Sequence, residues 1–251
     1  MDTIAAKLER LKREAQKEWK RTWRKKLRQA APANAAEWRA LAAAILGAVL
    51  RVALIIALPF LVLVRGSVFF YQNGGTPVWL SVLTAAILTG GVITAYAVWI
   101  ARKLMRRGVR GGRALVMPVA KWVALPLVVF YCGYSLLYLA SVNAKTAPVR
   151  AYYRSVHPLL RLALSTAILA DRNILITDTG RVPDDYGRMG LSTQTRSRHY
   201  KQTDGWIHAV DLRTTRRGFI KNRGVQFYFW LMGFDTRRHV GTADHLHVEL
   251  N

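Results

Sequence analysis

Three long apolar runs constrain this chain more than any other feature. They cover residues 44–64, 78–100 and 122–141, and roughly 20 apolar residues suffice for a helix to cross a lipid bilayer. Arg51 interrupts the first run. It can snorkel to the interface, pair with another helix or mark a later start of the span, and snorkelling is the simplest expectation. The sequence therefore predicts a region of three transmembrane helices within residues 43–141.

The basic residues predict an orientation for these helices. The net charge is +24, yet no acidic residue occurs between Glu37 and Asp171. Lys and Arg number 12 in residues 1–42 and six in the loop 101–113, whereas the loop 66–77 has none. Because cytoplasmic loops are enriched in Lys and Arg, we expect a cytoplasmic N-terminus and an extracytoplasmic segment 142–251. Nucleic acid is not an expected partner, since a nucleic-acid binder would not need the apolar runs.

Residues 1–42 are expected to form a basic amphipathic helix on the cytoplasmic side. Within residues 3–28 the apolar positions recur every three or four residues and make one stripe, while Lys and Arg occupy the other faces. The stripe consists of Ile4, Leu8, Leu11, Ala15, Trp19, Trp23 and Leu27. Two interpretations stay open: a helix lying on the anionic inner leaflet of the bilayer, or a solvated basic arm that only fixes the topology.

Residues 142–251 have the size of a small domain and an α+β pattern. A helix is expected at 157–170, with Pro158 in its first turn. The other expected elements are strands at 173–177, 206–212 and 245–250, an apolar strand or helix at 225–234, and a polar, turn-rich segment at 183–198.

The histidines and acids of this domain gather in two segments that could form a metal site. They are His199, Asp204, His208 and Asp211 in the first segment, and Asp244, His245 and His247 at the end of the chain. A catalytic zinc site needs three nitrogen or oxygen ligands and an open position for water. A His and an Asp from the first segment, completed by a His from the last strand, would supply those ligands.

The order of these residues resembles the zinc D-alanyl-D-alanine peptidase superfamily, which includes D,D-carboxypeptidases, D,D-dipeptidases, phage endolysin endopeptidases and the hedgehog signalling domain. The matching positions are Ser197 and His199, Ala209 and Asp211, and the terminal His245 and His247. The upstream helix, strand and arginine turn, with Gly180 and Arg181, are also similar. The resemblance covers about residues 155–251 and implies a small zinc domain with an antiparallel sheet.

The resemblance implies His199, Asp211 and His247 as ligands of a Zn²⁺ cofactor. Family members usually have a shorter interval between the first His and the Asp; here Asp211 is twelve residues after His199. The extra residues must loop out, and Asp204-Gly205 permits the required turn. The rival first ligand is His208. We favour His199, because positions 208 and 211 face opposite sides of a strand.

The resemblance also implies a catalytic base just before the last ligand and an arginine for the substrate. Family members have an acid three residues before that ligand or a histidine two before it, and this chain has both Asp244 and His245. We expect Asp244 to be the base and His245 to bind or polarise the substrate, with the reverse assignment left open. Arg181 would bind the substrate's carboxylate or carbonyl and stabilise the oxyanion. His157 and His239 are expected to be structural residues at a helix start and in a loop.

The charge pattern and the superfamily resemblance together imply a membrane-anchored zinc peptidase of the bacterial cytoplasmic (inner) membrane, encoded by a bacterium or a phage. Its substrate would be peptidoglycan stem peptides, cut as a D,D-carboxypeptidase or an endopeptidase. One alternative is a non-catalytic membrane protein whose degenerate domain binds wall peptide or a protein partner. Another is a three-helix pore or scaffold in which the external domain is secondary.

Overall fold

The computed structural model describes residues 2–30, 34–106, 116–188, 190, 192, 195–241 and 244–251. The chain divides into two compact units, Met1–Ile55 and Ile56–Asn251. The boundary falls inside helix α2 (Ala35–Gly74). The first unit holds α1 (Asp2–Ala30) and the beginning of α2. In α1 the described Lys and Arg side chains are exposed, as are Trp19 and Trp23, whose rings meet edge to face at 5.9 Å. The predicted N-terminal helix is therefore present.

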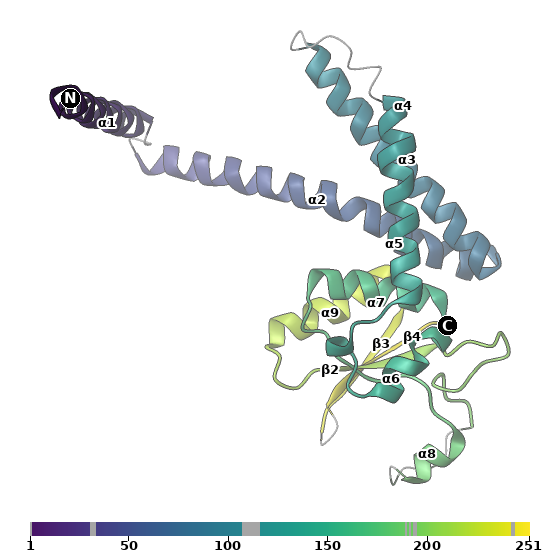
Figure 1. Cartoon of the computed structure of the whole chain (residues 1–251). Coiled ribbons are helices and arrows are strands. Elements are labelled where there is room, and N and C mark those ends of the chain that lie inside the picture. Colours follow the sequence, from purple (N-terminus) through teal and green to yellow (C-terminus); the bar gives the residue numbers. More distant parts are fainter. Residues whose placement is uncertain are drawn as a thin grey trace. The chain divides into compact units, whose positions relative to one another are not determined.

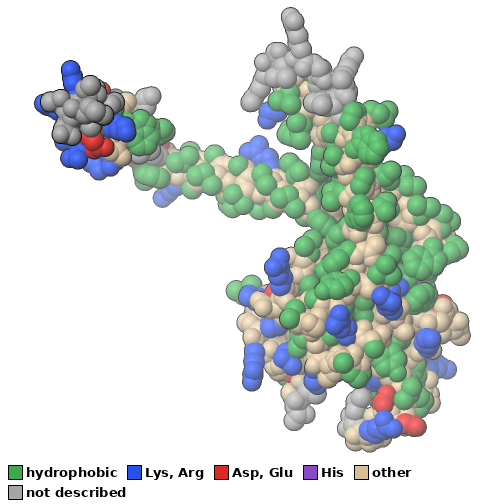
Figure 2. Space-filling model, in the orientation of Figure 1, with side chains coloured by type: hydrophobic (Ala, Val, Ile, Leu, Met, Phe, Trp, Pro, Cys, Tyr) green, Lys and Arg blue, Asp and Glu red, His purple; other side chains and the backbone are tan. Residues whose placement is uncertain are grey.

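Among the described residues, three helices are long and apolar enough to cross a membrane, as the sequence predicts. They are α2, α3 (Val78–Arg106) and the segment Met117–Leu137. The last combines α4 (Val116–Val119), a π-helical turn (Ala120–Ala124) and α5 (Leu125–Leu137). Figure 2 shows hydrophobic side chains covering the surface of these helices. Since a water-soluble helix would carry polar side chains on its outer face, these surfaces indicate a membrane protein.

Residues 142–251, here called the C-terminal domain, are α+β with one four-stranded antiparallel sheet. The strands lie in the order β1-β2-β4-β3. They are β1 (Ile176–Asp178), β2 (Ala209–Arg213), β3 (Asp235–His239) and β4 (His245–Glu249). The helices are α6 (Ala147–Tyr152), α7 (Pro158–Ala170), α8 (Pro183–Arg188) and α9 (Phe219–Met232), with short 3-10 turns at Ser141–Asn143 and Tyr153–Ser155.

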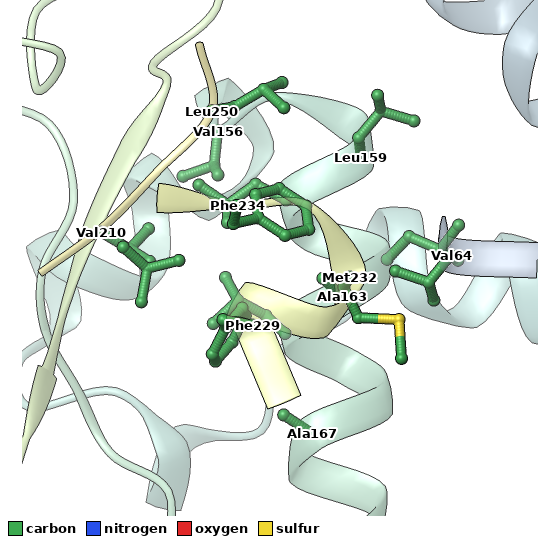
Figure 3. Packing of buried hydrophobic residues seen from close by; sticks show 14 of the residues in the cluster. Val64, Val156, Leu159, Ala163, Ala167, Val210, Phe229, Met232, Phe234 and Leu250 are labelled. Atoms are coloured by element: carbon green, nitrogen blue, oxygen red, sulfur yellow. The ribbon is translucent and has the colours of Figure 1, made fainter. Parts of the chain in front are cut away.

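Helix α7 lies between the membrane helices and the rest of the domain (Figure 1). Ten of its 13 residues are buried, because it packs against α3 and α5 as well as α9. The hydrophobic core is continuous across this junction: Phe229 and Met232 of α9 belong to the same buried cluster as Val64 of α2 (Figure 3). Within the second unit, the domain and the ends of the membrane helices therefore share one core.

The structure changes several of the expected elements. The apolar segment 225–234 is helical, forming most of α9 and its Gly233 C-cap. The polar segment 183–198 begins with α8. Strand β3 was not predicted, because Asp235–His239 has no apolar alternation and is an edge strand of the sheet. β1 and β2 begin later than their apolar runs do.

Candidate metal centre

Strand pairing brings the predicted ligands Asp211 and His247 together. The two residues are directly opposite each other on β2 and β4, and such pairs place their side chains within contact distance on one face of the sheet. Alternation then puts His245, His247 and Glu249 on this face, while Leu246 and Val248 are buried on the other. The terminal His-x-His thus faces Asp211 because the intervening residues belong to the core.

His199 reaches the same point from a loop. The carbonyl of His199 accepts a hydrogen bond from the Arg181 amide at 3.0 Å, and its amide donates to Ser197 Oγ at 3.2 Å. The residues between His199 and β2 loop out as predicted: Gln202 and Trp206 pair at 2.8 Å across a turn in which Gly205 has φ +84°. The longer interval therefore leaves His199 beside Asp211.

The three ligand atoms are spaced as a metal ion requires. The Nδ1 of His247 is 2.9 Å from Asp211 Oδ1 and 3.3 Å from His199 Nε2, and His199 Nε2 is 3.4 Å from Asp211 Oδ1. Ligands at about 2.0–2.1 Å from a tetrahedral ion lie about 3.3 Å apart. The trio His199, Asp211 and His247 could therefore hold a metal ion with little movement.

Neighbouring acceptors direct the metal-binding nitrogens of both histidines. Nδ1 of His199 donates to the Thr179 carbonyl at 2.6 Å, so the lone pair of this imidazole is on Nε2, toward Asp211. Nε2 of His247 donates to Glu249 at 3.1 Å, which leaves Nδ1 for the centre. Metal-ligating histidines are usually held by such a carbonyl or carboxylate on the other nitrogen. Thr179 and Glu249 thus orient the two imidazoles of a His199, Asp211 and His247 ligand set, which suits zinc.

Asp211 is the electrostatic centre of the site. Burial alone would raise the pKa of its carboxyl group, but the adjacent imidazoles of His199 and His247 hold that pKa well below its usual range. The same contact acts in reverse on His247: burial would lower its pKa, and the bonds to Asp211 and Glu249 raise it above the ordinary value. The carboxylate is therefore ionised, as a metal ligand must be.

Arg181 lies in the site, where it binds two carboxylates. Its Nη2 is 2.7 Å from Asp211 Oδ2 and its Nε is 2.6 Å from Asp178 Oδ2. Its Nη1 donates to the Tyr186 hydroxyl at 3.3 Å, and that hydroxyl donates to Ser197 at 2.6 Å. Arg181 therefore orients the ligand Asp211 in this structure.

Asp244 and His245 differ in their contacts: Asp244 is bound by Thr214 and Arg238, whereas His245 lies near Asp211. The carboxylate of Asp244 accepts hydrogen bonds from Thr214 at 2.5 Å and Arg238 at 2.9 Å, and the bond from Arg238 lowers its pKa. His245 begins β4, and its Nε2 is 3.7 Å from Asp211 Oδ1. His239 was expected in a loop, but it lies on β3 with its ring stacked on His245 at 4.8 Å.

A second group, His157, Asp204 and His208, could also hold a metal ion, so two such groups occur among the described residues. His208 belongs to this group and not to the first. His157 Nδ1 accepts from the Leu159 amide at 3.3 Å, which puts the imidazole proton on Nε2, 3.9 Å from Asp204 Oδ2. Burial lowers the pKa of His157 to about 3, so it is neutral. Because Nε2 of His157 carries the proton, it has no lone pair for a metal ion. The group His199, Asp211 and His247 is therefore better arranged to bind a metal.

Several residues of the site were not predicted from the sequence. Glu249 lies two positions after His247, so strand alternation alone could have identified it. Asp178, Tyr186 and the carbonyl of Thr179 belong to segments whose approach depends on the tertiary fold. The position of His239 could be predicted only if β3 were predicted, and β3 carries no apolar pattern.

Comparison of the chain with the models of known protein families, with curated proteins and with solved structures finds no match. The structure itself shows three helices long and apolar enough to span a membrane and an α+β domain, and among the described residues two His/Asp groups could hold a metal ion.

Gly180 allows the close packing behind this centre. A Cβ atom there would lie 2.8 Å from Ile207 Cδ1 and 3.0 Å from Tyr152 Cδ1. We expect Gly180→Ala to destabilise the domain by about 1–3 kcal/mol, the usual cost of overpacking, measured as a lower melting temperature in detergent. Gly187→Ala is the matched control, because a Cβ there meets nothing within 4 Å. Equal melting temperatures for the two variants would contradict the expectation.

Proposed function

We propose that the chain is a membrane-anchored zinc peptidase that hydrolyses peptidoglycan stem peptides, of carboxypeptidase or endopeptidase type. The observation that carries the proposal is the convergence of His199, Asp211 and His247, with their nitrogens directed by Thr179 and Glu249. Zinc, when bound, would supply a Lewis acid and a water of lowered pKa. The superfamily resemblance of residues 155–251 supports the choice of reaction and substrate.

The protein's own groups have distinct proposed roles. His245, 3.7 Å from Asp211, takes the proton from the attacking water and later delivers it to the leaving amine. Arg181 positions Asp211 through their 2.7 Å ion pair. Asp244, which the sequence favoured as the base, secures the start of β4 through Arg238 and Thr214.

The proposed location is the bacterial inner membrane, with the domain outside. The basic N-terminus and the basic loop 101–113 support a cytoplasmic placement for both. With three crossings, a cytoplasmic N-terminus supports a location of residues 142–251 beside the cell wall. The basic residues of α1 support contact with the anionic inner leaflet. The domain carries 17 Lys and Arg against nine acids, which suits an anionic wall polymer.

The test is digestion of purified muropeptides by the full chain in lipid nanodiscs with zinc, analysed by mass spectrometry. We expect loss of a terminal D-alanine or cleavage of a cross-link, and no product with His247→Ala. Asp184→Asn, an exposed residue of α8, is the control and should keep activity. A zinc-loaded wild type that cleaves no muropeptide would overturn the peptidase assignment.

A second candidate function is non-catalytic binding of wall peptide. It is favoured by the engagement of Arg181, whose guanidinium binds Asp178 and Asp211 in place of a substrate group. Retention of muropeptides by the wild-type chain without any cleavage would support it.

A further inference from the structure

We propose that the C-terminal part of one face of α9 inserts into the lipid interface beside the membrane helices. This face, here called the α9 face, is formed by Phe219, Ile220, Phe227, Trp230 and Leu231. The partner is the bilayer that the chain itself spans. The proposal rests on the membrane spans and not on the proposed peptidase activity, and it holds for either orientation of the chain.

The α9 face is exposed and lies on one side of the helix. At 100° per residue its five side chains lie within about 120° of the helix surface. Ile220 is 84% exposed, Trp230 62% and Phe227 58%. The opposite face is used for folding, since Asn222, Phe229 and Met232 are buried. Large contiguous apolar patches on a folded surface generally mark a protein or membrane contact.

The C-terminal end of α9 lies where α2 leaves the apolar part of its span. The apolar run of α2 ends at Val64, and Arg65 follows. Val64 and Val68 share a buried cluster with Met232 of α9, and Val64 and Met232 are labelled in Figure 3. A Cβ atom on Gly233, the C-cap of α9, would collide with the Arg65 guanidinium. Gly233 therefore lies beside Arg65, the first charged residue after the apolar run of α2, and Trp230 and Leu231 precede Gly233 by less than one helical turn.

Contacts with α2 hold the C-terminal end of α9 in this place. The side-chain amide of Gln72, also on α2, donates to the carbonyl of Gly233 at 3.3 Å and to that of Asn251 at 3.4 Å. The same helix end is therefore bound to α2 by apolar packing and by hydrogen bonds. Because α9 cannot turn about its axis without breaking its buried face, the exposed aromatic rings stay beside the span.

The chemistry of the α9 face fits a lipid interface better than a dry protein contact. Trp and Phe beside basic residues are typical of interfacial helices, since the rings enter the acyl boundary and the cations reach phosphates. Arg223 lies on this face, and its guanidinium is 5.4 Å from the centroid of the Phe219 ring as a cation–π pair. At the N-terminal end, a groove of about 800 Å³ is lined by Phe219 and Ile220 together with Arg172, Arg216 and Lys221.

The experiment measures the depth of single nitroxide labels in the full chain. Cys132 is the only cysteine, so Cys132→Ser gives a background for Trp230→Cys and Phe227→Cys, with Asp184→Cys as the aqueous control. Each labelled chain is placed in nanodiscs, and its collisions with oxygen and with a water-soluble nickel complex are compared. Melting temperatures close to that of the background chain verify the fold of each variant.

We expect the oxygen-to-nickel collision ratio to be several-fold higher at 230 and 227 than at 184. A ratio at both positions equal to that at 184 would overturn the proposal, because the face would then be in water. Protection of both positions from both reagents would overturn it in favour of a protein partner or a second copy of the chain.

Discussion

Asp211→Asn is expected to abolish tight metal binding by the triad of His199, Asp211 and His247. The carboxylate contacts His247 at 2.9 Å and His199 at 3.4 Å through one oxygen. An amide keeps the shape but loses the negative charge. Loss of an outer partner of a metal site costs roughly 10–100-fold in affinity, and we expect the loss of this inner ligand to exceed that range. Zinc content after dialysis and calorimetric titration of the full chain in detergent measure the effect.

The same substitution tests the metal-free fold. Asp211 Oδ2 pairs with Arg181 at 2.7 Å, and the Asp211 side chain is only 4% exposed. Removing one partner of a buried ion pair costs roughly 3–5 kcal/mol, and the remaining bond from Arg181 to Asp178 should keep the loss toward the lower end. Asp184→Asn is the control for both measurements. A variant that binds zinc as the wild type does would show that the metal is held elsewhere.

A comparison with Asp204→Asn separates the two candidate groups. Asp204 binds His208 at 2.8 Å in the second group. If the first group is the zinc site, Asp204→Asn should leave zinc affinity close to the wild-type value while Asp211→Asn removes it. The reverse pattern would assign the metal to His157, Asp204 and His208.

The parts of the fold that could be predicted are those fixed by local pattern. The spans follow from the length and polarity of their runs, and the alternation in HLHVEL predicts a strand with both histidines on one face. Residues 225–234 were ambiguous because aromatic residues favour strands, whereas the buried positions Phe229 and Met232 have helical spacing. Packing against α7 and α2 favours the helix, and this packing cannot be seen in the local sequence pattern.

The candidate site divides in the same way. The candidate ligands His199, Asp211 and His247 were predicted from the resemblance of their order to that of the zinc peptidase superfamily, and strand alternation favoured His199 over His208. The contacts that orient these side chains could not be predicted from the sequence, because Thr179 contributes a backbone carbonyl and Asp178 acts through Arg181. Asp244 precedes β4, so its direction depended on where the strand began, and the strand begins at His245.

His245→Ala is expected to lower kcat for peptide cleavage by about 10²–10⁴-fold, the usual contribution of a positioned general base, while zinc content changes little. The reason is geometric. His245 shares the face of β4 with His247 and lies 3.7 Å from Asp211. Its ring is supported by that of His239, stacked on it at 4.8 Å. Steady-state kinetics of the full chain, with zinc measured on the same samples, give the result.

Asp244→Asn is the matched comparison, because it changes the other candidate base by one atom. Its carboxylate is bound by Arg238 and Thr214, and an amide can keep the bond from Thr214. We therefore expect a loss in kcat of less than about tenfold, well below the effect of a general base. The opposite result would be a loss of about 10²–10⁴-fold with Asp244→Asn and full activity with His245→Ala. In that case Asp244 is the base. The bond to Arg238 must then open when substrate binds.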